Sequence, residues 1–305
     1  MKKTDWQKRI RRLHFNLRRK PITLVGDEGK PYRTALYILS ALVLVIIVAL
    51  ASREEPQIMA SAEVQSLQDR GVLRVGVRYD VPGLGSIEGG LEHDLARLLT
   101  ERLLPGSDTA ASLQLIEVNA MTLGTKLDDG GVDVVLALAS SAMASKYSYS
   151  IPYYSDPCVL VAMAGSSNFL LENMEIGVVQ SNKIRNSPEA ALLGAYIADN
   201  PNLNLKSKTY ASYPDMLDAL AAGSIRAVLL TELYVVRYSQ DYPIISTAFS
   251  IGPVNYALCS ASDSAALAQL GTLLLNELKE SGGLAALYMS NGLNTARIPA
   301  AANGS

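Results

Sequence analysis

The sequence feature that most constrains the fold is an uninterrupted apolar run from Ala35 to Ser52, which divides the chain of 305 residues into two parts. At about 1.5 Å per residue, an α-helix of this length is about 27 Å long, close to the hydrocarbon thickness of a bilayer. We therefore predict one transmembrane helix over residues 35–52. A folded region outside the membrane must then come from residues 53–305.

The residues before this run are strongly basic. Residues 1–33 hold eleven Lys and Arg side chains against three acidic ones, a balance of +8. Basic flanks stay on the cytoplasmic side, so we predict a cytoplasmic arm over residues 1–34 and a single-pass protein of the cell membrane whose residues 53–305 are extracytoplasmic. A cleaved signal peptide is the alternative, because Ala49-Leu50-Ala51 and Ala60-Ser61-Ala62 both fit a cleavage site. The long basic region and long apolar core favour an uncleaved anchor.

The charge of the remaining chain excludes one class of partner. After the first 33 residues, 16 basic and 26 acidic residues remain, a balance of −10, so we expect no nucleic acid partner. Residues 53–62 are short and polar and are interpreted as a stalk, and residues 298–305 as a disordered tail.

The region in between alternates short apolar segments with amphipathic ones. We predict strands over residues 72–77, 113–118, 132–138, 158–163, 175–179, 226–230 and 255–259. We predict helices over residues 90–104, 120–129, 188–199, 214–222 and 262–281. The predicted helix over residues 188–199 has a clear start in Ser187-Pro188-Glu189. Gly223 directly follows the predicted helix over residues 214–222 and ends it. Alternating strands and helices indicate an α/β fold with a mostly parallel sheet.

Five blocks of sequence, in order, resemble a known family. They are LQDRGVLRVGVRYDVPG (67–83), GLEHDLA (90–96), LDDGGVD with YSIPYY (127–133 and 149–154), EIGVVQSN (175–182) and LAAGSIRAVLL (220–230). The resemblance is to the extracellular solute-binding proteins of ABC importers, in particular the family that binds polar amino acids. It implies a two-lobed, type II periplasmic-binding-protein-like fold with two β crossovers. Lobe 1 would comprise residues 63–162 and 255–297, and lobe 2 residues 163–254, with a ligand bound between them by hinge closure.

The residues that bind an amino acid in this family are only partly present. The place of the arginine that binds the ligand carboxylate is taken by Met143, and the preceding threonine is replaced by Ser140. The aspartate that binds the ammonium is replaced by Thr231, with Glu232 next to it, and the stacking aromatic is replaced by Leu84. A buried charge left unpaired is costly, so binding of an α-amino acid does not follow directly.

Other polar residues are candidates for ligand contact. Lys183 and Arg185 precede the helix at Pro188, where they form an anion site or ordinary surface charge. Ser140, Ser141, Ser145, Tyr147 and Tyr149 form a hydroxyl-rich segment that binds a neutral polar ligand or is a solvated loop. The remaining candidates lie in the motif blocks and are Asp80, Ser181 and Asn182. Tyr79, Tyr153 and Tyr154 also supply hydroxyl-bearing aromatic rings.

Two cysteines and one histidine complete the candidates. Cys158 begins the outgoing crossover strand and Cys259 ends the returning one, so either a disulfide or two separate buried thiols fit. His93 is the only histidine after the apolar run. Hydrolytic triads and metal sites need more histidine or clustered acids and thiols, so we expect no enzyme activity, no metal and no cofactor.

Two functions remain. In the first, a membrane-anchored receptor captures a small polar molecule, an amino acid or a related compound, and presents it to an ABC permease. In the second, a degenerate receptor-like domain acts as a sensor or a protein-interaction module of a membrane complex without a transport ligand. The missing arginine and aspartate favour the second.

Overall fold

The computed structural model describes residues 55–79, 83–85, 88–119, 121–139, 146–165, 171–180 and 187–300. The chain divides into two units, Met1–Glu54 and Glu55–Ser305, and the account below concerns the second. The predicted arm and transmembrane helix lie outside the described residues. Within the described ranges, every helix is too short or too polar to cross a membrane.

The described strands form one eight-stranded sheet. In order across the sheet they are β2 (Leu113–Val118), β1 (Leu73–Arg78), β3 (Val134–Ala139), β8 (Ile244–Ala261), β4 (Tyr147–Met163), β7 (Ala227–Thr231), β5 (Glu175–Val179) and β6 (Lys206–Tyr210). Pairs β1–β2, β1–β3, β5–β6 and β5–β7 are parallel, whereas β3–β8, β4–β8 and β4–β7 are antiparallel. The sheet is therefore mixed, and the prediction of a mostly parallel sheet is wrong at its centre.

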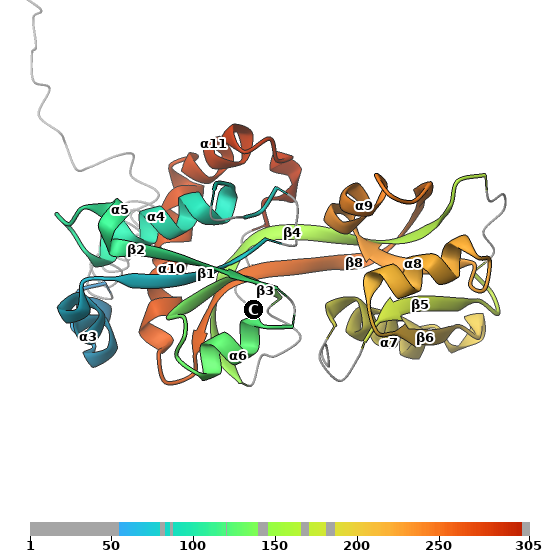
Figure 1. Cartoon of the computed structure of the whole chain (residues 1–305), viewed down its shortest axis with the longest axis horizontal. Helices are drawn as coiled ribbons and strands as arrows, with labels where there is room; N and C mark the ends of the chain where they lie inside the picture. Colours follow the sequence, from blue (N-terminus) through green and yellow to red (C-terminus); the bar gives the residue numbers. More distant parts are fainter. Residues whose placement is uncertain are drawn as a thin grey trace, which may run out of the picture. The chain divides into compact units, whose positions relative to one another are not determined.

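Two long strands join the two ends of this sheet (Figure 1). β8 pairs with β3 through residues 256–260, and β4 pairs with β7 through residues 158–161. Along almost their whole length β4 and β8 pair with each other. We call the part around β1, β2 and β3 the β1 half, and the part around β5, β6 and β7 the β5 half.

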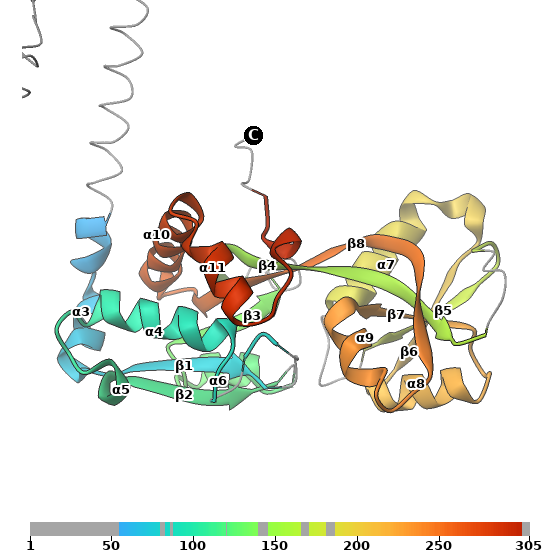
Figure 2. The same cartoon turned by 90° about the horizontal axis from the view of Figure 1, so that it is seen from above.

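Helices surround both halves, as Figure 2 shows from a second side. Those of the β1 half are α3 (Ala62–Arg70), α4 (Leu91–Leu103), α5 (Thr109–Ser112), α6 (Leu123–Asp128), α10 (Ala265–Glu280), α11 (Gly283–Ser290) and the 3-10 turn η2 (Thr295–Arg297). Those of the β5 half are α7 (Pro188–Asp199), η1 (Pro201–Leu203), α8 (Tyr213–Ala221) and α9 (Glu232–Tyr238). One large cluster of buried apolar side chains includes members from both halves, and a smaller one lies under α6.

Local signals set several of these boundaries as predicted. The Ser187 hydroxyl accepts a hydrogen bond from the Ala190 N–H at 3.3 Å, with Pro188 in the first turn, so α7 begins where the sequence indicates. Gly223, with φ of 71°, follows the end of α8, and its N–H donates to the Leu220 carbonyl.

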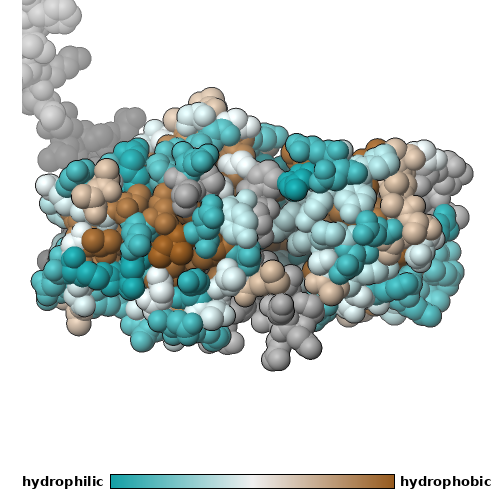
Figure 3. Space-filling view, in the orientation of Figure 1, coloured by the Kyte–Doolittle hydropathy of each residue, from teal (hydrophilic) through white to brown (hydrophobic). Residues whose placement is uncertain are grey.

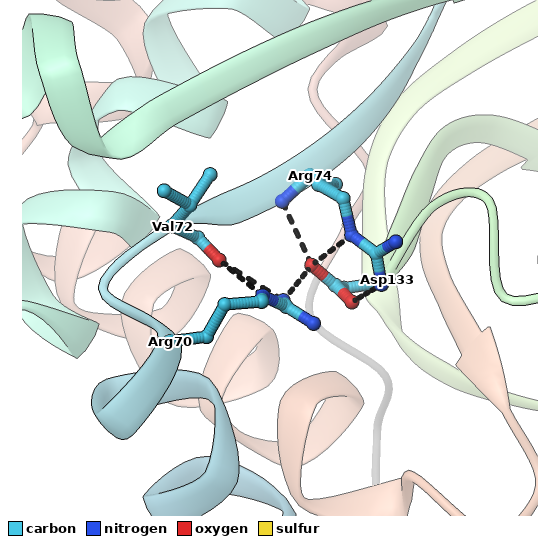
Figure 4. A network of polar contacts seen from close by, with 4 residues as sticks. All are labelled: Arg70, Val72, Arg74 and Asp133. Carbon is cyan, nitrogen blue, oxygen red and sulfur yellow. Dashed lines mark hydrogen bonds and ion pairs between the residues drawn. The ribbon is translucent and has the colours of Figure 1, made fainter.

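Asp133, the last residue of the LDDGGVD block, ties three segments of the β1 half together (Figure 4). Its carboxylate accepts hydrogen bonds from the Arg74 backbone N–H and the Arg74 guanidinium, both at 2.8 Å, and from the Arg70 guanidinium. Arg70 also donates to the Val72 carbonyl. Although burial opposes ionisation, these contacts hold the pKa of Asp133 below its usual value. This motif residue therefore has a structural role at the entry to β1.

Two predictions about the ends of this region do not hold for the residues that the structure describes. The predicted stalk is folded where it is described, because residues 55–59 are helical, Ile58 and Met59 pack against the core, and Glu55 pairs with Arg102. Ile298, in the predicted tail, also packs against the core.

Of the two alternatives for the cysteines, the structure shows separate thiols. Cys158 lies opposite Gly252 and Cys259 lies opposite Tyr149, so the two residues occupy different places along the β4–β8 ribbon. Both thiols are free and fully buried, which is the alternative that the sequence left open.

Candidate ligand-binding site

The candidate site follows from the directions of the strands. β3 is antiparallel to β8 and β7 is antiparallel to β4, while β4 and β8 run in opposite directions between the two halves. The carboxyl ends of β1, β2 and β3 therefore point toward the β5 half, and those of β5, β6 and β7 point toward the β1 half. Ligands of α/β proteins bind beside the carboxyl ends of parallel strands, so the junction between the halves is the candidate site.

Most predicted contact residues follow these strand ends in the sequence but lie outside the described residues. Asp80 comes two residues after β1, the segment Ser140, Ser141 and Met143 follows β3, and the segment Ser181, Asn182, Lys183 and Arg185 follows β5. Their role in binding stays a prediction.

The predicted residues that are described are either buried or paired with another side chain, and their role in binding also stays a prediction. Thr231, the last residue of β7, is fully buried, and Glu232 forms an ion pair with Arg297. The Tyr149 hydroxyl is buried beside the Cys259 thiol and makes no hydrogen bond in good geometry with any described residue. Leu84 is fully buried in the core, so it does not replace a ligand-stacking ring.

Other tyrosines that we considered for ligand contact have structural partners. The Tyr147 hydroxyl donates to Asp128 at 2.9 Å, and the Tyr153 hydroxyl donates to Glu92 at 2.8 Å. Tyr79 is half exposed, and the side-chain amide of Asn119 donates to its hydroxyl at 3.1 Å. Tyr79 and Asn119 directly follow β1 and β2, so they offer polar groups at the junction.

A buried polar network begins in the β1 half. The Glu92 carboxylate is fully buried in the first turn of α4, where it accepts hydrogen bonds from the Tyr153 hydroxyl and from the backbone N–H of Arg78 at 3.0 Å. Arg78 is the last residue of β1, and its side chain is also buried. Its guanidinium donates to the hydroxyl of Tyr234 in α9 at 2.7 Å, so the network reaches the β5 half.

The network continues through stacked tyrosine rings. The ring of Tyr234 stacks on Tyr213 of α8 with centroids 4.4 Å apart, and the Tyr213 hydroxyl donates to Glu189 at 3.0 Å. The buried Glu189 lies in the first turn of α7 and also accepts a hydrogen bond from the Ser187 hydroxyl at 2.8 Å. Each half thus has a buried glutamate in the first turn of a helix, satisfied by a tyrosine hydroxyl.

A third buried acid lies in the crossover itself. Asp156 of β4 is fully buried; its Oδ2 accepts a weak hydrogen bond from the Leu233 N–H at 3.4 Å, at the start of α9. Its Oδ1 and the Thr231 hydroxyl make no hydrogen bond in good geometry with any described residue. Burial is the main cause that raises the pKa of Asp156 to about 7, with Glu232 and Glu189 adding to the effect.

The sequence contained weak signals for these residues. Glu92 lies in a motif block, and Asp156 interrupts a run rich in tyrosine and apolar residues. Arg78 also lies in a block, but its partner Tyr234 is 156 residues away, which no local pattern indicates. Within the described part of the chain, no group of three or more His, Cys, Asp or Glu side chains is arranged to hold a metal ion.

The chain is similar in fold to solved amino acid receptors. One is the solute receptor for L-cysteine of Neisseria gonorrhoeae, with 18% identity, a TM-score of 0.57 and coverage of 78% of this chain and 99% of that one. Another is an arginine 3rd transport system periplasmic binding protein from Legionella pneumophila, with 18% identity, a TM-score of 0.56 and coverage of 72% and 99%. The substrate-binding protein of an amino acid ABC transporter matches at 21% identity, with a TM-score of 0.54 and coverage of 72% and 98%.

No protein-family model matches the chain. At such low identities, the similarity establishes a shared fold and leaves the ligand open.

Proposed function

We propose that this protein is a membrane-anchored, extracytoplasmic receptor that binds a small polar solute, an amino acid or a related compound, and delivers it to an ABC-type importer. The two halves correspond to the two lobes of a type II binding protein, and β4 and β8 are the two crossovers. In this proposal, residues 35–52 form the membrane anchor and residues 53–305 lie outside the cytoplasm.

The observation that carries the proposal is the arrangement of the strand ends. Carboxyl ends from both halves face one junction, and the fold is shared with receptors for L-cysteine and arginine. Two polar groups near that junction, those of Tyr79 and Asn119, suit a solute that forms hydrogen bonds.

A ligand screen tests the proposal. The melting temperature of the full-length chain in detergent is measured against amino acids, polyamines, organic acids, sugars and short peptides. A ligand that binds only the folded state raises the melting temperature in a concentration-dependent way. A saturating shift supports the receptor, and the absence of any shift, from protein free of carried-over ligand, contradicts it.

The second function, a sensor or protein-interaction module without a transport ligand, is favoured by one specific observation. Glu232, the acid nearest the place of the family's ammonium ligand, is engaged by Arg297, and Thr231 is fully buried. Purification of the protein with its membrane partners separates the two functions. A permease and an ATPase support transport, and a different membrane protein supports the module.

A further inference from the structure

Among the described residues, helix α9 is an element at which side chains of the two halves contact each other. It follows β7 directly and packs against β7, β4 and β8, so it belongs to the β5 half. Its first and third residues, Glu232 and Tyr234, are nevertheless bound by arginines from the β1 half.

The first of these contacts is an ion pair between Arg297 of η2 and Glu232. η2 packs against α11 and β4. The Tyr288 hydroxyl of α11 lies within hydrogen-bond distance of two carbonyls, those of Tyr153 at 2.5 Å and Arg297 at 3.3 Å. The backbone of Arg297 is therefore held against the β1 half, while its guanidinium reaches α9.

The second contact is the hydrogen bond from Arg78 to Tyr234. The backbone of Arg78 is fixed by Glu92, and the ring of Tyr234 is fixed by stacking on Tyr213. Both ends of this contact are thus held by their own half. A contact between two pre-organised groups constrains the distance between the elements that carry them.

The pairing of β4 with β8, the two strands that join the halves, has a weak point close to α9. Pro157 lies opposite Pro253, so neither residue has an N–H for the ladder, and next to them Cys158 lies opposite Gly252, which has φ of 124°. The register of β4 on β8 also shifts between residues 158 and 161. Residues that make few hydrogen bonds in the ladder, or that have a positive φ as Gly252 does, can absorb the changes in backbone dihedral angles that a hinge requires.

We propose that the contacts Arg297–Glu232 and Arg78–Tyr234 form a latch on α9 that holds the two halves in the observed arrangement before any solute binds. The inference rests on the proposed function, because capture of a solute requires the halves to move relative to each other. The four side chains are positioning residues. They set the population of the latched arrangement and hence the apparent affinity for a solute.

Distance measurements between the two edges of the sheet test the latch. Spin labels are attached at Q114C in β2 and K206C in β6, both exposed positions, in the full-length chain in detergent. The native Cys158 and Cys259 are buried and do not compete for the label. Pulsed electron paramagnetic resonance then gives the distance distribution without any added solute.

Charge reversal gives the sharpest set of variants. We expect E232R and R297E each to shift and broaden the distribution, and the double variant E232R/R297E to restore it. The matched control is D241R, which breaks the Arg237–Asp241 pair in the same region and is expected to leave the distribution unchanged. Equal distributions for the parent and both single variants overturn the latch, as does a double variant that behaves like the singles.

Milder variants keep the test valid if a charge reversal prevents folding. E232Q removes the ion pair, and Y234F removes only the hydroxyl that Arg78 contacts. Each variant is expected to shift the distance distribution in the same direction as the charge reversals. An unchanged distribution in both variants overturns the proposal. Because no solute is present, this result is independent of the ligand screen. If the variants shift the distance distribution but no solute raises the melting temperature, the latch is retained and the receptor is rejected. If a solute raises the melting temperature but the variants leave the distribution unchanged, the receptor is retained and the latch is rejected.

Discussion

Replacement of Asp156 by asparagine tests the reading of the crossover as a buried acidic site. Asp156 is fully buried, and its Oδ1 makes no hydrogen bond in good geometry with any described residue, although the neighbouring Thr231 hydroxyl favours the charged form. Burial raises the pKa of its carboxyl group from 3.8 to about 7 in the folded protein. An amide of the same shape has no charge to bury and still accepts the Leu233 N–H.

The size and sign of the effect follow from these two pKa values. A difference of about three pH units corresponds to a free energy of about 4 kcal/mol, at about 1.4 kcal/mol per unit. Because the pKa of Asp156 is raised on folding, its contribution to stability is fully present below pH 3.8, is progressively lost as the pH rises and is gone above about pH 7. We therefore expect D156N to match the parent near pH 4 and to be more stable by up to about 4 kcal/mol at pH 8.

Urea unfolding of parent and variant at pH values from 4 to 8, followed by circular dichroism, measures this difference. The control is D241N, at an exposed acid of the β5 half. This variant removes an exposed carboxylate and leaves Asp156 in place, so it controls for the general effect of the substitution. A stability difference between D156N and the parent that does not change with pH would refute the reasoning, as would a D156N protein that is less stable than the parent at pH 8.

Three further predictions concern the rest of the domain. D133N should destabilise the protein by about 3 kcal/mol near pH 7, because it leaves the Arg74 guanidinium and the Arg74 N–H poorly paired. The difference in stability from the parent should shrink as the pH falls through the lowered pKa of Asp133, and urea unfolding at several pH values measures both effects. Y149F should raise the free energy of unfolding by about 1 kcal/mol, since it removes a buried hydroxyl that makes no hydrogen bond in good geometry with any described residue and lies beside the weakly hydrogen-bonding Cys259 thiol. Urea unfolding measures the change, and a destabilised variant would contradict the prediction. Cys158 and Cys259 should react with a thiol reagent only after denaturant is added, and reducing agents should leave the melting temperature unchanged. Fewer than two reactive thiols per chain in denaturant without a reducing agent would contradict the structure with two free thiols.

The sequence predicted the elements whose limits are set by local chemistry. β2, β5 and α7 have the predicted bounds, because periodic apolar segments there are flanked by turn and cap residues. β4 and β8 were predicted only in part, since Pro157, Gly252 and Pro253 interrupt their patterns although pairing continues across them. The edge strand β6 is mostly exposed and polar, and it offered no alternating apolar signal.

The elements that form the junction were harder to predict. α9 begins immediately after β7 and has only seven residues, so its helical period is hidden behind the strand. Its signals were Thr231 at the N-cap, Glu232 in the first turn, and the tyrosines at 234 and 238. The contacts that α9 makes with Arg78 and Arg297 depend on tertiary pairing, which local propensity does not encode.

The polar junction gives an argument about function that the fold alone does not. Buried acids and arginines contribute little net stability, because the favourable free energy of their pairing only offsets the unfavourable free energy of removing them from water. A fold whose halves needed only to stay together would be served equally well by apolar side chains in place of Arg78, Asp156 and Glu189. Arg78 instead makes a directional contact with Tyr234 of the other half, close to the Pro157–Pro253 weak point. The hydrogen bond from Tyr213 to Glu189 in turn holds the ring on which Tyr234 stacks. We infer that the network specifies one arrangement of the halves, which a transport receptor uses to tune solute affinity and a sensor uses to hold a signalling state.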